Sequence, residues 1–493
     1  MSNEPHVIVI GAGVGGLSTA IDLAAGGARV TLFESASVPG GRMREIVVDG
    51  QGIDSGPTVF TMRWVFDELF AAAGHDLGEE VDLVKADVLA RHSWIDGSRL
   101  DLYADVERTV DAIGEFAGAA EASAYRRFAA ESKRIFETLD HSFMRAEKPS
   151  PLGLTLSIGL LRVSRLWATK PFTTMWKELG RMFADPRLRQ LFARYATYCG
   201  SSPFQSPATL MLIAHAERAG VWYVEGGMQR FAEALARVAE ASGAELRYNA
   251  SVERLLVRER RVCGVVLDGG EEVNADAVVF NGDVAALTDG LLGEAAEKSV
   301  RKRNRESRSL SAITWSLKGR VEGFPLEHHT VFFGDNYIDE FGRIFDRSSV
   351  CERPTIYICA QDRGGGRQPD FASERLFLLV NAPPRTLTDD EVAAIEENAF
   401  QHLEMHGVRI EADGEMATTS PGYFAGRFPG SGGAIYGWPT HGFSGSFKRS
   451  GSRSRLKGLY LAGGSVHPGP GVPMTALSGR IAAKSVRADL GLA

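Results

Sequence analysis

The stretch HVIVIGAGVGGLSTAIDLAAGGARVTLFES, residues 6–35, decides the fold. Its apolar run at 7–10 predicts a short buried strand, and the apolar residues of 14–25 recur on one face with helical spacing. Residues 28–35 predict a second strand. A strand, a glycine-rich turn, a helix and a strand within about 30 residues form a βαβ unit, which predicts a parallel sheet.

The turn in this unit carries the GxGxxG spacing, at Gly11, Gly13 and Gly16. There, the first glycine permits a tight turn, the second lets a pyrophosphate approach the backbone, and the third lets helix and strand pack closely. Phosphates favour the helix N-terminus because its free N–H groups and dipole attract negative charge. Glu34 closes the second strand and predicts hydrogen bonds to ribose hydroxyls, which disfavours a 2′-phosphate. The alternative is a glycine-rich turn beside a surface glutamate.

Three further glycine turns lie outside this unit. They are Pro39-Gly40-Gly41-Arg42, then Asp54-Ser55-Gly56-Pro57 after a short strand, and Gly226-Gly227-Met228 before a helix. A nicotinamide enzyme does not need the first of these turns. Each turn by itself also fits an ordinary turn or a helix cap.

The segment LYLAGGSVHPGPGVPMTALSGR, residues 459–480, also exposes much of its backbone, because it is rich in glycine. It begins as a buried strand over 459–462 and leads into a predicted last helix over 474–483. Between them stand glycines and prolines, with no charged side chain until Arg480. The segment predicts either a large flat ligand against its backbone or a tight turn without a ligand.

In this order the motifs resemble the carotenoid (phytoene) desaturase family of FAD oxidoreductases. The resemblance runs essentially end to end, through GxGxxG with Glu34, PGGR, DSGPT, GVWYVEGGM, the NGD at 281–283 and the terminal LYLAGGSVHPGPGVP. Within the family, the chain is most similar to the bacterial hydroxyneurosporene (methoxyneurosporene) desaturases. The resemblance implies an α/β fold with a Rossmann-type, amine-oxidase-like FAD-binding domain, a discontinuous α+β substrate domain and a helical insertion.

The order of predicted elements suggests where these parts lie. The nucleotide-type elements occur at the start, the middle and the end of the chain, which predicts a discontinuous domain. We expect the FAD-binding domain at 1–90, 222–300 and 445–493, the substrate-binding sheet domain at 91–104 and 301–444, and a helical region at 105–221.

The resemblance also implies which residues meet FAD. The GGR turn packs on the cofactor, the backbone at Val252 meets the adenine, and the terminal segment lines the flavin ring. Val466 stands where family members often have threonine. The implied cofactor contacts are Gly11, Gly13, Gly16, Glu34, Gly41, Arg42, Gly56, Pro57, Val252, Gly464, Ser465, Gly471, Val472, Pro473 and Met474.

The implied reaction introduces a C=C bond into a linear acyclic carotenoid. We expect 3,4-desaturation of a 1-hydroxy (or methoxy) carotenoid such as hydroxyneurosporene, with hydride transfer to flavin N5 and proton loss from the neighbouring carbon. The sequence does not identify the terminal electron acceptor or a strong base. His467 is a possible catalytic group, and a structural imidazole is the alternative.

Aromatic residues predict an apolar substrate pocket, with packing in a protein core as the alternative. They follow the DSGPT turn or lie in the helical region: Phe60, Trp64, Phe66, Phe70, Tyr195, Tyr198 and Phe204. His92, beside Trp94, is a weaker catalytic possibility than His467.

Composition narrows the classes of partner. A net charge of −7 gives no electrostatic case for nucleic acid. Four scattered cysteines without a CxxC pair predict a reduced cytoplasmic protein without a metal site. We expect no signal peptide and no membrane span. The run LGLTLSIGLL, 152–161, is followed by Arg, Lys and Trp up to residue 177, which predicts peripheral contact with the inner (cytoplasmic) membrane.

Three other functions compete with this prediction. A phytoene desaturase shares the motifs, and the sequence separates it poorly. The HPGxGVP ending argues against a flavin amine oxidase. An intact GxGxxG with Glu34 and GGR argues against a non-catalytic isoprenoid-binding escort protein.

Overall fold

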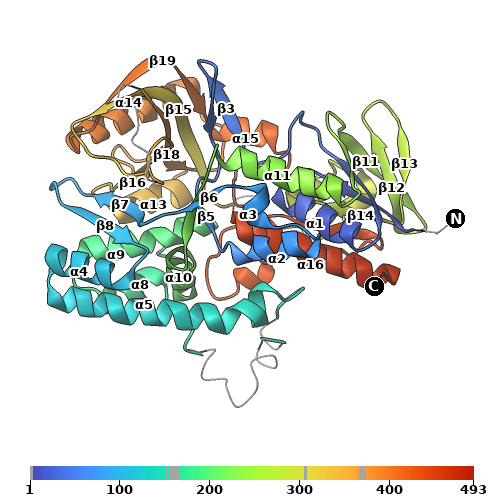
Figure 1. Cartoon of the computed structure of the whole chain (residues 1–493), viewed down its shortest axis with the longest axis horizontal. Helices are drawn as coiled ribbons and strands as arrows, with labels where there is room; N and C mark the ends of the chain where they lie inside the picture. Colours follow the sequence, from blue (N-terminus) through green and yellow to red (C-terminus); the bar gives the residue numbers. More distant parts are fainter. Residues whose placement is uncertain (1–3, 151–152, 155–166, 305–307, 366–372, 493) are drawn as a thin grey trace.

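The computed structural model describes residues 4–150, 153–154, 167–304, 308–365 and 373–492. Two large sheets lie next to each other along the long axis of the molecule, and a layer of helices lies beneath one of them (Figure 1).

The first large sheet is parallel and has the strand order β10-β2-β1-β14-β20. In its centre, Val7 of β1 pairs with Val30 on one side and Ala277 on the other. The central strand is apolar throughout because both faces of such a sheet are covered. This confirms the predicted βαβ unit. The bounds are β1 His6–Ile10, β2 Arg29–Phe33, β10 Glu245–Arg247, β14 Ala277–Phe280 and β20 Leu459–Leu461.

Different layers cover the two faces of this sheet. Val7 and Val9 pack among the residues of three helices, whereas Ile8 packs on the opposite face against a small antiparallel sheet. This alternation follows the two-residue period of a strand. The helices are α1 (Val14–Ala25), α11 (Met228–Ala241) and α16 (Val472–Leu490), and the small sheet holds β11 (Val252–Arg258), β12 (Arg261–Leu267) and β13 (Glu272–Asn274).

Helices α1 and α16 touch backbone to backbone. A Cβ at Gly479 would lie 2.1 Å from the Gly15 carbonyl oxygen, and the Thr19 hydroxyl donates to the Gly479 carbonyl at 3.0 Å. The terminal motif therefore lies beside the glycine loop. The predicted bounds 474–483 of the last helix were wrong at both ends. Its charged residues Lys484 and Arg487 fall outside the buried face, so the apolar stripe continues to Leu490.

The second large sheet has the order β19-β15-β18-β17-β16-β7-β8 and is antiparallel except for the β16–β7 pair. Helix α14 (Asp389–Met405) packs on it, and the Trp315 indole N–H donates to Glu396 at 2.7 Å. The bounds are β7 Val88–Ser93, β8 Arg99–Tyr103, β15 Ser311–Glu322, β16 His329–Phe332, β17 Ile356–Ala360, β18 Glu374–Ala382 and β19 Arg409–Thr419.

Short strands join the two large sheets. The Gln361 side chain accepts from the Asp54 N–H at 3.0 Å and donates to the Asp54 carbonyl at 2.8 Å. The Ser55 and Ser316 hydroxyls lie 2.5 Å apart. These contacts fix the DSGP turn against the second sheet. The short strands are the hairpin β3 (Glu45–Val48) with β4 (Gln51–Asp54), and the sheet of β5 (Phe60–Thr61), β9 (Val221–Val224) and β6 (Leu83–Lys85).

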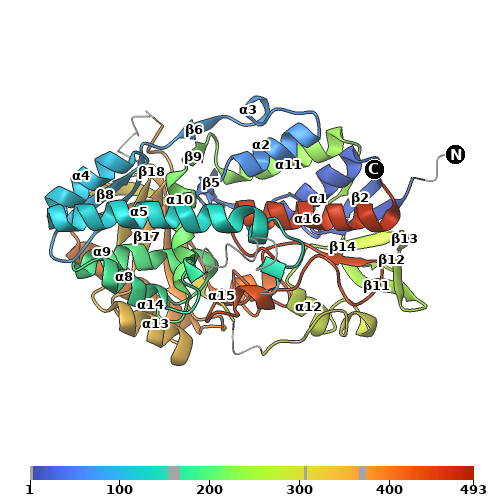
Figure 2. The same cartoon turned by 90° about the horizontal axis from the view of Figure 1, so that it is seen from below.

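The described residues of 105–221 are mostly helical, as expected. Their longest helix, α5, extends along the lower edge of the molecule in Figure 1 and crosses the middle of the view from below in Figure 2. The predicted membrane segment 152–161 lies outside the described residues except for 153–154. The helices are α4 (Val106–Ala117), α5 (Ala119–Leu139), α8 (Met175–Met182), α9 (Pro186–Ala193) and α10 (Leu212–Arg218).

Two more helices besides α14 lie among the described residues of 308–440. Helix α13 (Tyr337–Asp346) buries Tyr337, Phe341 and Ile344 at helical spacing, and the Asn336 side chain caps its start. Helix α15 (Pro421–Arg427) follows later in the chain. The domain boundaries stay a prediction.

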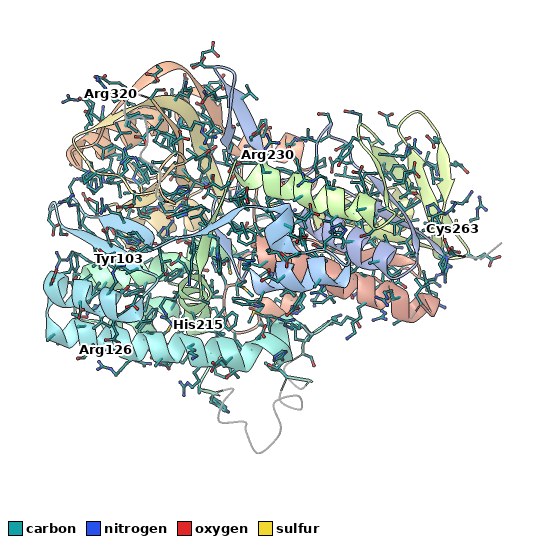
Figure 3. The ribbon with its side chains drawn as sticks, viewed as in Figure 1. Tyr103, Arg126, His215, Arg230, Cys263 and Arg320 are labelled. Atoms are coloured by element: carbon teal, nitrogen blue, oxygen red, sulfur yellow. The ribbon has the colours of Figure 1, made fainter. Side chains whose placement is uncertain are left out.

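All four cysteines are free thiols. Cys263 lies at one end of the molecule, and Tyr103 and Arg126 lie at the other (Figure 3). Within the described residues, no helix is both long enough and apolar enough to cross a bilayer.

Candidate active site

The glycine loop after β1 is built from close backbone contacts. Gly11 has a φ of +98°, and a Cβ at Gly16 would lie 2.0 Å from the Gly11 carbonyl oxygen. The Asn281 side chain, after β14, donates to that same carbonyl at 3.1 Å. A side chain at Gly13 or Gly16 would meet Asn281, so the spacing of glycines is a packing requirement here.

Glu34 lies beside this loop, at the carboxyl end of β2. Its carboxylate accepts hydrogen bonds from the Ala12 N–H at 2.6 Å and the Ala36 N–H at 2.8 Å. The Ala250 N–H donates to the Glu34 carbonyl at 2.8 Å, which brings the start of β11 and Val252 to the same edge. The carboxyl ends of parallel strands are where such sheets bind their ligands.

The GGR turn lies against the glycine loop. Gly40 forms a bridge with Gly13, and a Cβ at Gly41 would lie 3.3 Å from the Gly13 Cα. Arg42 follows, with its guanidinium carbon 4.6 Å from the centre of the Phe428 ring. Burial lowers the pKa of Arg42, and its buried Nε has no hydrogen-bond partner among the described residues.

The DSGP turn adjoins the same place. A Cβ at Gly56 would lie 1.9 Å from the Arg42 carbonyl oxygen, so this glycine is fixed by its neighbour. Gly56 and Pro57 both line the main cavity of the molecule.

The terminal segment closes the site from the other side. The Ser465 hydroxyl accepts from the Val284 N–H at 3.1 Å, next to the NGD motif. A Cβ at Gly464 would contact Pro470 at 3.5 Å. Gly471, with a φ of +108°, is the N-cap of α16 and has no side-chain cap. It lines the cavity together with Val472, Pro473 and Met474.

These features fit FAD. Helices α1 and α16 both begin at glycines without side-chain caps, so their first N–H groups are free to bind oxygen or nitrogen atoms of a ligand. The Arg42 Nε is a buried donor that finds no acceptor in the described part of the chain. A dinucleotide between the glycine loop and α16 would satisfy these groups, and the bare backbone leaves space for it.

One cavity of about 500 Å³ extends from this site between the helical region and the second large sheet. Such a volume is typical of small-molecule sites. Its walls are mainly aliphatic and aromatic. They include Met144, Leu154, Ile213, Phe377 and Leu379, which come from the helical region and the second sheet.

Exposed aromatic rings lie at one part of this cavity. Trp167 is 66% exposed, and Phe172 is 63% exposed. Phe172 stacks on Phe443 with ring centroids 4.6 Å apart, and Phe443 lies 5.7 Å from Phe447. We call Trp167, Phe172 and Phe443 the aromatic rim. All three line the cavity, so the rim joins it to the protein surface.

A few polar groups face the apolar cavity. Arg194 lines it between two phenol rings, with its guanidinium carbon 5.6 Å from the ring centres of Tyr198 and Tyr357. The Thr58 hydroxyl lies 2.6 Å from the Tyr357 phenol oxygen. Arg194 comes from the stretch PRLRQLFARY, where its pattern resembles the charged face of a surface helix, so sequence reasoning missed it.

Arg449 is a second cavity residue that sequence reasoning missed. Its guanidinium donates to the Gly464 carbonyl at 3.1 Å and to the Trp438 carbonyl at 2.7 Å. Burial lowers its pKa. Arg449 thus supports the backbone of the terminal segment.

The His467 side chain makes a structural hydrogen bond. Its Nε2 lies 2.8 Å from the Phe143 carbonyl oxygen, which fixes the ring against the helical region. Burial lowers its pKa to about 4, so the imidazole is neutral at pH 7, and its buried Nδ1 has no partner among the described residues. His467 is absent from the described cavity lining, and its catalytic role stays a prediction.

Most aromatic residues expected in the pocket belong to the core instead. Phe60, Phe66 and Phe70 are fully buried and pack around Phe231, with ring centroids 4.8 to 6.5 Å apart. Among the seven predicted residues, Tyr198 alone lines the described part of the cavity. Phe60 comes from β5, and Phe66 and Phe70 come from helix α2 (Trp64–Ala72), so the three rings pack on Phe231 of α11 in the core. His92 is also buried, stacked on Phe333, and its pKa is lowered to about 3 by burial.

One described group of side chains has ligand types that bind metals. His328, His329 and Cys359 bring ligand atoms within 4.8 Å of one another. The Nδ1 atoms of the two histidines already contact the Arg363 carbonyl at 2.6 Å and the Tyr357 phenol at 2.7 Å. The expectation of no metal site stays a prediction.

Comparisons with known proteins agree with this site. The profile of the family "Flavin containing amine oxidoreductase" matches residues 14–487. A hydroxyneurosporene desaturase of Rubrivivax gelatinosus is 47% identical, over 98% of this chain and 94% of the relative. One from Cereibacter sphaeroides is 46% identical, over 99% and 98%. A zeta-carotene-forming phytoene desaturase of Myxococcus xanthus is 32% identical, over 97% and 92%.

Solved structures share the fold at low identity. A putrescine oxidase has a TM-score of 0.59 at 15% identity, covering 99% of both chains. Cyclohexylamine oxidase of Brevibacterium oxydans has a TM-score of 0.58 at 15% identity, covering 99% of this chain and 100% of that one. These likenesses confirm the amine-oxidase-type FAD-binding fold. The chain belongs to the flavin-containing amine oxidoreductase family, and within it to the FAD-dependent carotenoid desaturases.

Proposed function

We propose that this protein desaturates a linear acyclic 1-hydroxy carotenoid such as hydroxyneurosporene at its 3,4 bond. The observation that carries the proposal is one apolar cavity that reaches from Gly56, Pro57 and the start of α16 to the aromatic rim. A long apolar chain fits such a cavity, whereas a small amine needs far less apolar wall. The relatives named hydroxyneurosporene desaturase, at 44–47% identity, favour this substrate.

In this proposal, the edge of the parallel sheet would hold FAD. The α1 N-terminus with Gly11, Gly13 and Gly16 would bind the pyrophosphate, and Glu34 would bind a ribose. Val252 would contribute backbone to the adenine site. Gly41, Arg42, Gly464 and Ser465 would bind the middle of the cofactor, and Gly471 to Met474 would contact the flavin ring.

When bound, FAD supplies the hydride-accepting N5 atom. The chain's own residues position the substrate and exclude water. Pro57, Val472 and Pro473 present rigid apolar surface at the inner end of the cavity, where water would otherwise compete. The apolar walls hold the polyene in line, so that the bond to be oxidised stays next to the flavin site.

The substrate dissolves in the bilayer, so the protein must reach it there. In our proposal the aromatic rim enters the interface of the inner membrane from the cytoplasmic side. Trp and Phe are suited to this depth, and the exposed Lys177 and Lys448 lie close in sequence to the rim and favour anionic lipid headgroups.

Anaerobic flavin reduction tests the function. The purified FAD-loaded protein is mixed with liposomes that carry 1-hydroxyneurosporene or phytoene, or with a simple amine in solution. The proposal predicts that the oxidised flavin band bleaches with the hydroxylated carotenoid. Bleaching by phytoene only would assign an early desaturation instead, and bleaching by the amine only would overturn the carotenoid proposal. Flavin that binds but resists all three would point to a non-catalytic carrier.

A further inference from the structure

Several polar side chains line the otherwise apolar cavity, and one of them adjoins the proposed flavin site. Thr58 follows Pro57 directly in the chain, and both line the cavity. The Thr58 hydroxyl lies 2.6 Å from the Tyr357 phenol oxygen, which lies 2.7 Å from the His329 Nδ1. These contacts hold the Thr58 hydroxyl in one place, and its oxygen keeps a lone pair for a ligand in the cavity.

Arg194 lies near the Tyr357 end of this chain of hydroxyls, with its guanidinium carbon 5.6 Å from the centre of the Tyr357 ring. It lines the cavity, and none of the ion pairs found among the described residues includes it. Its charge is balanced at a distance, since the buried Glu217 carboxylate accepts from the Tyr195 hydroxyl and from the Tyr198 hydroxyl at 2.8 Å. The Tyr198 phenol is one hydrogen-bond partner of Arg194. A guanidinium has five N–H donors, so a cavity ligand with an oxygen atom would give Arg194 a further acceptor.

We propose that Arg194 and Thr58 form the subsite for the terminal hydroxyl group of the substrate, and so select hydroxylated carotenoids. The proposal rests on the proposed function. An alcohol offers one donor and an acceptor oxygen. Arg194 donates to the alcohol oxygen, and the Thr58 oxygen accepts the alcohol proton. A methyl ether accepts from Arg194 but has no proton for Thr58, so the subsite favours the alcohol.

The position of this subsite agrees with the reacting bond. The alcohol carbon C1 is two bonds from C3, or about 2.5 Å at ordinary carbon–carbon geometry. A hydroxyl group in a 3,4-desaturation must therefore lie next to the flavin, far from the surface end of the polyene. Thr58 meets this requirement because Gly56 and Pro57 belong to the proposed flavin site. The aromatic rim, at the other part of the cavity, has no charged side chain of its own.

The cost of a missing hydroxyl gives the expected size of the effect. A carotenoid without it excludes water from Arg194 and Thr58 but offers them no oxygen, and sites built to bind a hydroxyl discriminate strongly against analogues that lack it. We expect the wild-type holoenzyme to prefer 1-hydroxyneurosporene over neurosporene in kcat/KM by on the order of tenfold or more.

Substitutions at the subsite test the proposal. Arg194→Met keeps length and removes the donors, and Thr58→Val keeps shape and removes the hydroxyl. The measurement is kcat/KM of each FAD-loaded variant for both carotenoids in liposomes. We expect each variant to reduce the preference at least fivefold, mainly through lost activity on the alcohol, and Thr58→Ser to restore it. The matched control is Thr209→Val, because the Thr209 hydroxyl also lines the cavity but donates to the Thr169 carbonyl at 2.7 Å. It should keep the preference.

The outcomes separate this proposal from the function. If wild type oxidises both carotenoids equally well, or if the variants lose both activities in proportion, the subsite is wrong and the desaturase function stands. If wild type oxidises neither carotenoid, the proposed desaturase function is wrong, and the subsite proposal, which rests on it, is wrong as well. Should Arg194→Met not fold, the Thr58→Val and Thr58→Ser pair decides, since both change little volume.

Discussion

The Asp54 carboxylate accepts a hydrogen bond from the Met228 N–H at 2.6 Å, although 174 residues separate them. It also accepts from the Gln229 N–H at 3.3 Å. Gly227 has a φ of +93°, and a Cβ there would lie 2.6 Å from the carboxylate. The DSGP turn and the GGM turn are therefore one structural unit, in which Asp54 caps helix α11.

Removing this cap should destabilise the protein. Asp54→Ala leaves the first N–H groups of α11 without an acceptor, and losing a helix cap costs about 1 kcal/mol. Asp54→Asn keeps one acceptor oxygen and should lose less. Thermal unfolding of the holoproteins measures both, and equal melting temperatures for Asp54→Ala and wild type would contradict the role of Asp54 as a cap.

The same carboxylate should make stability depend on pH. Burial raises the pKa of Asp54 from 3.8 to about 6, although the Met228 and Gln229 N–H groups oppose the shift. The pKa of Asp54 is higher in the folded state than in the unfolded state. Its stabilising contribution to the free energy of unfolding is therefore full below pH 3.8 and is lost as the pH rises through 6. Its upper bound is about 3 kcal/mol.

Melting curves between pH 4 and 7.5 test this linkage. We expect the stability of wild type relative to Asp54→Asn to fall as the pH rises from 4 to 6 and to level off above. Parallel pH profiles for the two proteins would show that Asp54 titrates as an ordinary carboxylate.

Gly16→Ala should impair cofactor binding. The new Cβ would lie 2.0 Å from the Gly11 carbonyl oxygen, so the glycine loop must move. Overpacking of this kind costs typically 1–3 kcal/mol, equivalent to roughly 5- to 150-fold in FAD affinity if the strain falls on the bound form. The control is Gly426→Ala in α15, where nothing lies within 4 Å and φ is ordinary. Flavin titration of the two apoproteins gives the answer, and equal affinities would contradict the packing argument.

Phe66→Ala should affect stability and spare substrate recognition. Phe66 is fully buried against Phe60 and Phe231, and Phe→Ala changes in a core cost about 3–5 kcal/mol. We expect a lower melting temperature with an unchanged KM for carotenoid, measured below the transition. A raised KM at unchanged stability would return Phe66 to the substrate pocket.

The aromatic rim predicts a membrane-binding defect. The double variant Trp167→Ala/Phe172→Ala removes two highly exposed rings and should weaken liposome binding by roughly 30-fold or more, since each buried side chain contributes about 1 kcal/mol or more. The control Val47→Ala/Ile338→Ala removes apolar groups of similar exposure (66% and 61%) that lie outside the described cavity lining. Equal flotation of the two variants with liposomes would rule out the rim as the contact.

The cofactor half of the molecule was predictable because its requirements are local. GxGxxG, GGR and the terminal glycines mark places where backbone must approach a ligand or another backbone, and the structure brings them to one sheet edge. The helix α1 follows its predicted bounds, Val14–Ala25. Sequence periodicity alone predicted this helix.

The substrate half was less predictable because its cavity depends on tertiary contacts. Phe60 and Phe66 are of a residue type that also lines apolar pockets, and only their packing around Phe231 places them in the core. Arg194 and Tyr357 meet across the cavity from a helical segment and a distant strand, and neither belongs to a motif. Local sequence patterns do not predict contacts between residues that are this far apart in the chain.

Isotope labelling tests the central claim most directly. 1-Hydroxyneurosporene with deuterium at C3 and C4 is incubated with the holoenzyme in liposomes, and the product is analysed by mass spectrometry. The account predicts that one deuterium leaves C3 and one leaves C4, with one equivalent of flavin reduced under anaerobic conditions. A product that keeps all its deuterium while the flavin is reduced would contradict 3,4-desaturation.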